Sequence, residues 1–111
     1  MIKEIKQYEI FLVNLDPTVG KKIKKTRPAV VISPFSMNNF LGTIVVCPMT
    51  TSIHPRWRSR IQTICARKKA EIAIDQIRAI SKKRIVKKID CLKKDEALQV
   101  RQVITEMYGE S

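Results

Sequence analysis

Apolar residues fall in short, closely spaced runs along most of the chain, and these runs predict β-strands. The run at 43–48 is continuous enough in Ile and Val to be buried on both faces. The run at 61–65 alternates between apolar and polar positions, as a half-exposed strand does. Turn-forming residues separate the runs, among them Asp16-Pro17-Thr18. We therefore expect short strands at 8–15, 27–33, 43–48, 61–65, 71–74 and 85–89. Turns are expected at 66–70 and 81–84, and a turn or a short helical segment at 36–39.

The periodicity changes in the last part of the chain, where residues 95–108 follow the helical repeat. Apolar side chains recur there at Leu98, Val100, Val103, Ile104, Met107 and Tyr108. Asp95 is the expected N-cap of this helix and Gly109 its C-cap. Strands followed by one amphipathic helix predict a mainly β (α+β) fold. We expect one domain over residues 1–111, a small, strongly bent barrel of about six or seven short antiparallel strands with a C-terminal helix.

Charge indicates the kind of partner. Lys and Arg total 22 against 10 Asp and Glu, a net charge of +12. Such an excess favours an anionic partner, nucleic acid first, an acidic protein segment next and an anionic membrane third. No uncharged stretch approaches the length of a spanning helix, and the charged N-terminus does not resemble a signal peptide. We expect a cytoplasmic protein that does not contact membranes.

The sequence lacks the residues that several classes of functional site require. Cys47, Cys65 and Cys91 are odd in number and far apart, and His54 is the single histidine, so neither a zinc site nor a disulfide framework is predicted. We interpret the three cysteines as reduced and structural. No Gly-x-Ser-x-Gly motif occurs, and 3 glycines cannot form the known phosphate loops. The sequence therefore predicts no bound metal and no cofactor.

RNA cleavage is compatible with what remains, because the 2′-hydroxyl of RNA is itself the nucleophile. The protein has to supply alignment, positive charge facing the phosphate, and proton transfer. Arg27 precedes Pro28 at the start of a predicted strand, so its backbone is fixed while its planar guanidinium can meet phosphate oxygens. Thr50 follows another strand and can donate a hydrogen bond. The alternatives are a surface arginine and a strand-end cap.

The motifs resemble, in order and spacing, those of the MazF/PemK family of toxin endoribonucleases. The resemblance rests on Ile10-Phe11-Leu12-Val13-Asn14-Leu15-Asp16-Pro17-Thr18-Val19-Gly20, Thr26-Arg27-Pro28-Ala29-Val30-Val31-Ile32-Ser33, Val45-Val46-Cys47-Pro48-Met49-Thr50-Thr51-Ser52 and Asp75-Gln76-Ile77-Arg78-Ala79-Ile80. It extends over nearly the whole chain.

This resemblance implies an SH3-like barrel, a homodimer and metal-independent cleavage of single-stranded RNA to a 2′,3′-cyclic phosphate and a 5′-hydroxyl. The implied catalytic pair is Arg27 and Thr50, with Asp75 as a possible acid/base helper. Some PemK-like members use an arginine two positions before this aspartate, where Ala73 stands here. Implied partners are the RNA substrate and an acidic antitoxin protein, with which such toxins also bind DNA.

Residues expected to bind RNA flank the catalytic pair. Gln76 can read a base edge or pack in a dimer interface, and Trp57 can stack on a base or pack within its loop. We interpret His54 as a solvated loop residue. The predicted RNA-binding set is Lys21, Lys22, Lys24, Lys25, Thr51, Ser52, Gln76 and Arg78.

Two other functions are compatible with this sequence. A non-catalytic nucleic-acid-binding barrel would account for the charge without any chemistry. A gyrase-poisoning toxin of the same fold would act by binding a protein. RNA cleavage and DNA supercoiling assays separate the three.

Overall fold

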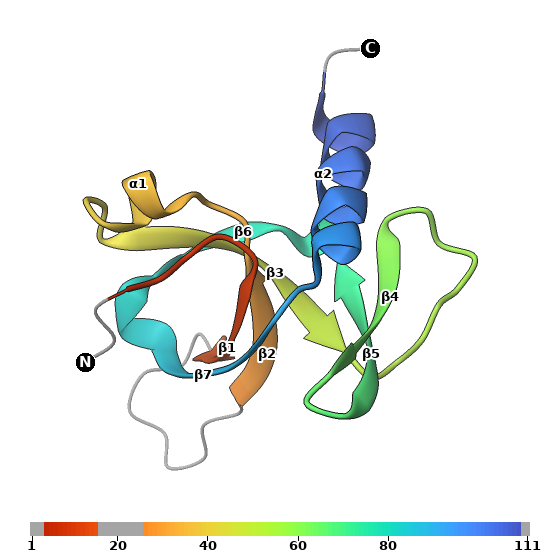
Figure 1. Cartoon of the computed structure of the whole chain (residues 1–111), viewed down its shortest axis with the longest axis horizontal. Coiled ribbons are helices and arrows are strands. Elements are labelled where there is room, and N and C mark those ends of the chain that lie inside the picture. The colour runs from red at the N-terminus through yellow and green to blue at the C-terminus, as the bar shows by residue number, and fades with distance from the viewer. Residues whose placement is uncertain (1–3, 16–25, 110–111) are drawn as a thin grey trace.

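The computed structural model describes residues 4–15 and 26–109, and all structural statements concern these ranges. Within them, seven strands are accompanied by two α-helices and two 3₁₀ helices (Figure 1). The strands are β1 (Glu9–Asn14), β2 (Thr26–Val31), β3 (Thr43–Thr50), β4 (Arg60–Cys65), β5 (Lys68–Ala73), β6 (Arg78–Ser81) and β7 (Ile85–Cys91). The helices are α1 (Phe35–Asn38), η1 (Ile74–Gln76), η2 (Lys82–Arg84) and α2 (Lys94–Tyr108).

Strand β3 organises the sheet, because it pairs with three other strands. The order is β4-β5-β3-β2-β1-β7, with β6 also on β3, and every pairing is antiparallel. The first half of β3 pairs with β6, and its last two residues, Met49 and Thr50, pair with β5. Partners on two sides curl the sheet into a half-barrel (Figure 1). The predicted mainly β fold with a C-terminal helix is confirmed.

Two hydrophobic clusters lie on opposite faces of the central strands. In β1, Ile10 belongs to one cluster and Phe11 to the other, and all four side chains of Ile10, Phe11, Val30 and Val31 are buried. Successive residues of a strand point to opposite faces, so this segregation means that β1 and β2 are covered on both sides. Val100 of α2 covers the first cluster. As predicted, β3 is also buried on both faces over most of its length.

The β4–β5 hairpin differs from the prediction. Residues 66–70 were expected to form a turn, but β5 begins at Lys68, opposite Cys65. The turn consists of Ala66 and Arg67 alone, with φ values of 49° and 70°. Paired positive φ values are typical of the tight hairpin turns that Asn and Gly favour. Because neither residue occurs here, the sequence carried no signal for so short a connection.

Helix α2 begins before its predicted cap. Asp95 lies inside the helix, and Lys93 is the N-cap residue. The backbone N–H of Lys93 donates to Glu96 Oε1 at 3.0 Å. Backbone N–H groups at the start of a helix have no carbonyl partner within the helix, and the Glu96 side chain supplies one here. Gly109 is the C-cap, as predicted, and its N–H donates to the Thr105 carbonyl at 2.9 Å. At this end the Tyr108 hydroxyl donates to the Ile74 carbonyl at 3.0 Å, which ties α2 to η1.

The three cysteines are free thiols, and two of them occupy the structural positions that were predicted. Cys47 and Cys65 are buried in the core, whereas Cys91 is exposed. Burial, and to a smaller extent the nearby charge of Asp75, raise the pKa of the Cys47 thiol to about 12. Cys47 is therefore an apolar core residue at neutral pH. No described helix is both long and apolar enough to cross a bilayer.

Candidate active site

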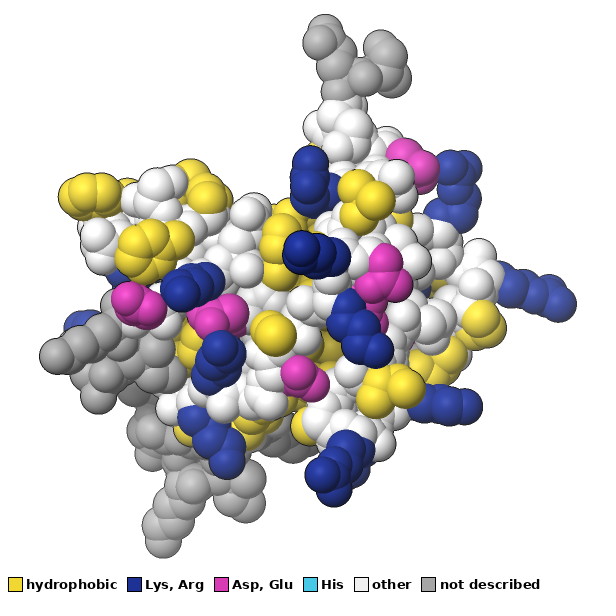
Figure 2. Space-filling model, viewed as in Figure 1, with side chains coloured by type: hydrophobic (Ala, Val, Ile, Leu, Met, Phe, Trp, Pro, Cys, Tyr) yellow, Lys and Arg dark blue, Asp and Glu magenta, His cyan; other side chains and the backbone are white. Residues whose placement is uncertain are grey.

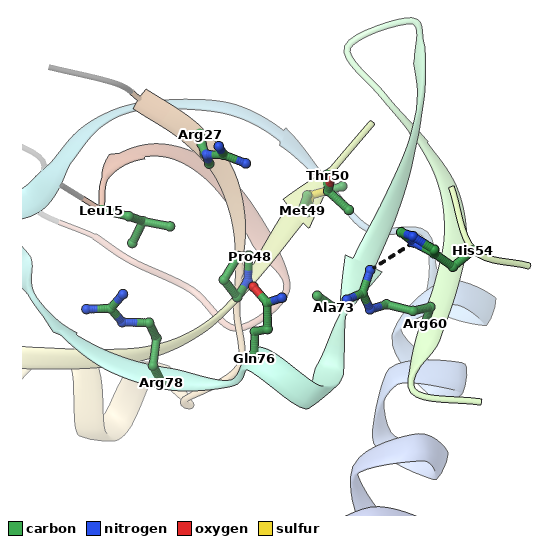
Figure 3. Close-up of a pocket in the computed structure, with 10 residues that line it drawn as sticks. All are labelled: Leu15, Arg27, Pro48, Met49, Thr50, His54, Arg60, Ala73, Gln76 and Arg78. Atoms are coloured by element: carbon green, nitrogen blue, oxygen red, sulfur yellow. Dashed lines mark hydrogen bonds between the residues drawn. The ribbon is translucent and has the colours of Figure 1, made fainter. Parts of the chain in front are cut away.

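A pocket of about 430 Å³ lies where the ends of β2 and β3 approach the segment that joins β5 to β6 (Figure 3). It brings together four of the residues predicted for the site, Arg27, Thr50, Gln76 and Arg78, from different parts of the chain. The other lining residues are Leu15, Pro48, Met49, His54, Arg60 and Ala73. The juxtaposition of Arg27 and Thr50 follows from the antiparallel pairing of β2 with β3.

Arg27 and Thr50 are held by strands but keep reactive groups available. Arg27 pairs with Val13 of β1, while its side chain remains exposed at the pocket. Thr50 ends β3, and its Oγ1 accepts the N–H of Ser52 at 3.0 Å. A hydroxyl that accepts this bond still has its own hydrogen to donate. The pair therefore offers a cation and a hydroxyl donor to one ligand.

The predicted RNA-binding residues are only partly brought together. Gln76 ends η1 and Arg78 begins β6, and both line the pocket. Thr51 and Ser52 are exposed in the turn after β3, beside the pocket rather than in its lining. The predicted phosphate-attracting lysines lie outside the described residues; they are Lys21, Lys22, Lys24 and Lys25.

Asp75 faces Arg60 and does not line the pocket. Arg60 donates from Nε to Asp75 Oδ1 at 2.8 Å and from Nη2 to Oδ2 at 3.4 Å. The hydrogen bond from Arg60 lowers the pKa of the Asp75 carboxyl, and burial only partly opposes it. At neutral pH Asp75 is therefore an ionised group that orients a pocket arginine.

A buried carboxylate, Glu71 on β5, was not singled out from the sequence. It is 0% exposed and accepts hydrogen bonds from Gln62 Nε2 (2.6 Å), Arg60 Nη1 (2.7 Å) and the His54 backbone N–H (2.5 Å). Its Oε2 also lies 3.1 Å from His54 Nδ1. Burial raises the pKa of Glu71, but these hydrogen bonds together outweigh it and lower the pKa to about 2. Glu71 is thus a buried anion that fixes Arg60 and His54.

The environment of His54 differs from the solvated loop position that was expected. Its ring stacks on Trp57, with centroids 3.9 Å apart and planes at 17°, and its side chain is 32% exposed. The Arg60 guanidinium carbon lies 4.6 Å from the Trp57 ring centroid. These contacts order the loop between β3 and β4. The sequence offered one hint of this arrangement, because Arg60 and Glu71 are charged residues in or next to strands. The alternation of apolar and polar residues did not show that their side chains would face each other in the interior.

The pocket is cationic. Among the described residues that line it are three arginines, Arg27, Arg60 and Arg78, and no carboxylate. Across the face seen in Figure 2, Lys and Arg side chains are widely spread and acidic ones are fewer. Within the described ranges, His, Cys, Asp and Glu form no group of three that could hold a metal ion. A small β half-barrel with an arginine-lined pocket defines a protein suited to a polyanionic ligand.

Comparison with known proteins identifies the family. Residues 6–108 match the model of the PemK-like, MazF-like toxin of type II toxin-antitoxin systems. Endoribonuclease EndoA of Bacillus subtilis is 31% identical over 107 residues, which cover 86% of this chain and 92% of that protein. Endoribonuclease MazF of Staphylococcus epidermidis is 26% identical over 113 residues, 95% of this chain and 92% of its own length. The chain therefore belongs to the PemK/MazF toxin family.

Solved structures support the fold. A MazE–MazF crystal structure from Deinococcus radiodurans superimposes with a TM-score of 0.80 at 22% identity, over 96% of this chain and 98% of the other. The half-barrel with its C-terminal helix is thus the fold of MazF toxins.

Proposed function

We propose that this chain is an endoribonuclease toxin that cleaves single-stranded RNA without a metal ion. The observation that carries the proposal is the pocket itself, which combines Arg27 and Thr50 with two further arginines and no carboxylate among its described lining. Relatives named as endoribonucleases support the activity. The 2′-oxygen attacks the adjacent phosphorus, the bond from phosphorus to the 5′-oxygen breaks, and the 5′-oxygen gains a proton. The products are a 2′,3′-cyclic phosphate and a 5′-hydroxyl.

In this mechanism Arg27 is a charge stabiliser. Negative charge grows on the non-bridging phosphate oxygens as the 2′-oxygen attacks, and a guanidinium meets two such oxygens at once. Arginine remains protonated in proteins, so Arg27 is not the proton acceptor. The Thr50 hydroxyl donates to the same oxygens, because accepting the N–H of Ser52 leaves its own hydrogen available and phosphate oxygens are acceptors.

The residues around Arg27 and Thr50 bind the RNA strand. Gln76 and Arg78 bind the bases and phosphates next to the scissile bond, with Thr51 and Ser52 at the edge of the pocket. Asp75 is a helper that acts by orienting Arg60. The four lysines between Lys21 and Lys25 attract the RNA backbone without reading its sequence.

Two protein partners complete the proposal, an acidic antitoxin and a second copy of the chain. Structures that pair relatives of similar fold with an antitoxin support the first, and the net charge of +12 favours an acidic segment that covers the pocket. An exposed apolar patch at α1, seen in yellow in Figure 2, supports the second, because such a patch favours a protein contact. It consists of Phe35, Met37, Phe40 and Leu41, and Phe40 is 84% exposed.

The direct test is incubation of the purified protein with long, mixed-sequence RNA in excess EDTA. We expect discrete fragments, because no step of the proposed chemistry uses a metal ion, and DNA of the same sequence should remain intact because it has no 2′-hydroxyl. Intact RNA that the protein still binds would instead support a non-catalytic nucleic-acid-binding barrel. Cleavage that stops in EDTA would contradict metal independence.

A further inference from the structure

His54 lies in the pocket with its ring fixed on two sides. Trp57 stacks against one face of the ring at 3.9 Å between centroids. Glu71 Oε2 lies 3.1 Å from Nδ1, and Glu71 Oε1 accepts the backbone N–H of His54. A buried carboxylate therefore determines both where the loop runs and how the imidazole is oriented. Figure 3 shows His54 beside Arg60 at the pocket.

These contacts also determine which nitrogen of His54 carries the hydrogen. A carboxylate only accepts hydrogen bonds, so the ring nitrogen that faces Glu71 must be the donor. Arg60 Nη1 lies farther from Nδ1, at 3.4 Å, and already donates to Glu71 Oε2 at 2.7 Å. The neutral ring therefore has its hydrogen on Nδ1 and its lone pair on Nε2. This Nε2 makes no hydrogen bond to any residue within 4–15 or 26–109.

We propose that His54 is the general base of the cleavage reaction and that Glu71 orients it, an inference that rests on the proposed function. Nε2 accepts the proton of the 2′-hydroxyl as the 2′-oxygen bonds to phosphorus. The bond from phosphorus to the 5′-oxygen breaks, and a water molecule protonates the departing oxygen. The hydroxide left by that water takes the proton back from His54, so protons and charges balance over the cycle.

The charges around His54 suit this role. Glu71 on β5 stabilises the imidazolium that forms when the proton is accepted, much as a buried carboxylate supports the histidine of a catalytic triad. Arg60 on β4 touches both groups and lies between Glu71 and Asp75. Across the pocket lie two further positive groups, Arg27 and Arg78, which are available to the phosphate while His54 handles the proton.

The proposal predicts how the rate depends on pH. A histidine base must be neutral to accept a proton, so cleavage should fall as the medium becomes acidic and imidazole protonates. The carboxylates beside it stay ionised over this interval, because the pKa values of Glu71 and Asp75 are both lowered. We call the fall in cleavage rate at acidic pH the acidic limb of the pH profile, and we attribute it to His54.

The test compares His54→Gln with the wild-type protein and with Arg56→Lys, a charge-preserving change at an exposed position of the same loop. We expect His54→Gln to lower kcat by about 10²- to 10³-fold, a usual effect of losing a general base, and to abolish the acidic limb. Binding of RNA with a 2′-deoxy residue at the scissile position should stay within about twofold of wild type, since the base acts on chemistry rather than on binding. Arg56→Lys should match the wild type in every measurement.

The outcomes separate this inference from the proposed function. If the wild type leaves all RNA intact, the proposed function fails and the role of His54 fails with it. If the wild type cleaves RNA and His54→Gln cleaves it with the same kcat and the same pH profile, only the inference about His54 is overturned. A lower kcat with an unchanged acidic limb overturns it too, because a residue that only supports the loop would give that result. Partial restoration of His54→Ala by free imidazole would support the assignment.

Discussion

Replacing Arg27 with alanine is expected to lower the rate of RNA cleavage by about 10³-fold, as expected when a main stabiliser of transition-state charge is lost. Its side chain is exposed in the pocket and its backbone is held by β1, so the melting temperature should stay within about 2 °C of wild type. Arg27→Lys should recover only part of the rate, because an ammonium keeps the charge but lacks the planar fork. Single-turnover cleavage and thermal unfolding measure the two quantities.

Arg58→Ala is the matched control, since it removes one arginine from an exposed position that does not line the pocket. The Arg58 side chain is 86% exposed and pairs with Glu106 at 3.3 Å. We expect cleavage by this variant to remain within about twofold of wild type, because exposed ion pairs contribute little. Equal loss of cleavage in both variants would mean that overall charge, rather than Arg27 itself, determines the rate. If the Arg27→Ala variant is unfolded, the result would indicate that Arg27 has a structural role.

Removing the buried charge at Glu71 is expected to produce the largest loss of stability. Glu71→Ala leaves Arg60 and Gln62 without an acceptor that both now use, and breaking a buried ion pair costs about 3 to 5 kcal/mol. Urea unfolding measures this loss. The control is Glu106→Gln, a change in an exposed pair, which should cost less than about 1 kcal/mol. A loss for Glu71→Ala as small as that of the control would contradict the role of Glu71 as the organiser of this region.

The same carboxylate gives the stability a defined dependence on pH. The pKa of Glu71 is about 2 in the folded chain, against an ordinary value of 4.5. Because the folded value is the lower one, the stabilisation is fully present above the ordinary value and is lost as the pH falls from there to about 2. Glu71→Gln should lack this part of the acid sensitivity.

The sequence was most informative where strands have clear beginnings and ends. Pro28 predicted a strand start close to the observed one, but β2 begins two residues earlier, at Thr26, so Arg27 is part of the sheet and pairs with Val13. Thr50 was predicted just beyond the third strand, and it is the last residue of β3. The pocket unites these two positions with Gln76 and Arg78, the two residues of the Asp75–Ile80 motif that the resemblance assigned to RNA binding.

The arrangement of Arg60, Glu71 and His54 could not be predicted in the same way. A buried ion pair depends on which strands cover which face, and the alternating pattern of β4 did not show that the Arg60 side chain would be 5% exposed. His54 belongs to a loop whose course is determined by a distant carboxylate on β5, and no local rule links the two. The two-residue turn at Ala66 and Arg67, which determines the register between β4 and β5, also lacked its usual residues.

The chemical identity of the new RNA ends tests the central claim most directly. After cleavage in excess EDTA, the downstream fragments should accept phosphate from polynucleotide kinase without prior dephosphorylation, because they carry a 5′-hydroxyl. The upstream fragments should have the mass of a 2′,3′-cyclic phosphate, and Arg27→Ala should give neither product at a comparable rate. Fragments with a 5′-phosphate and a 3′-hydroxyl would contradict attack by the 2′-oxygen, and with it the roles proposed for Arg27, Thr50 and His54.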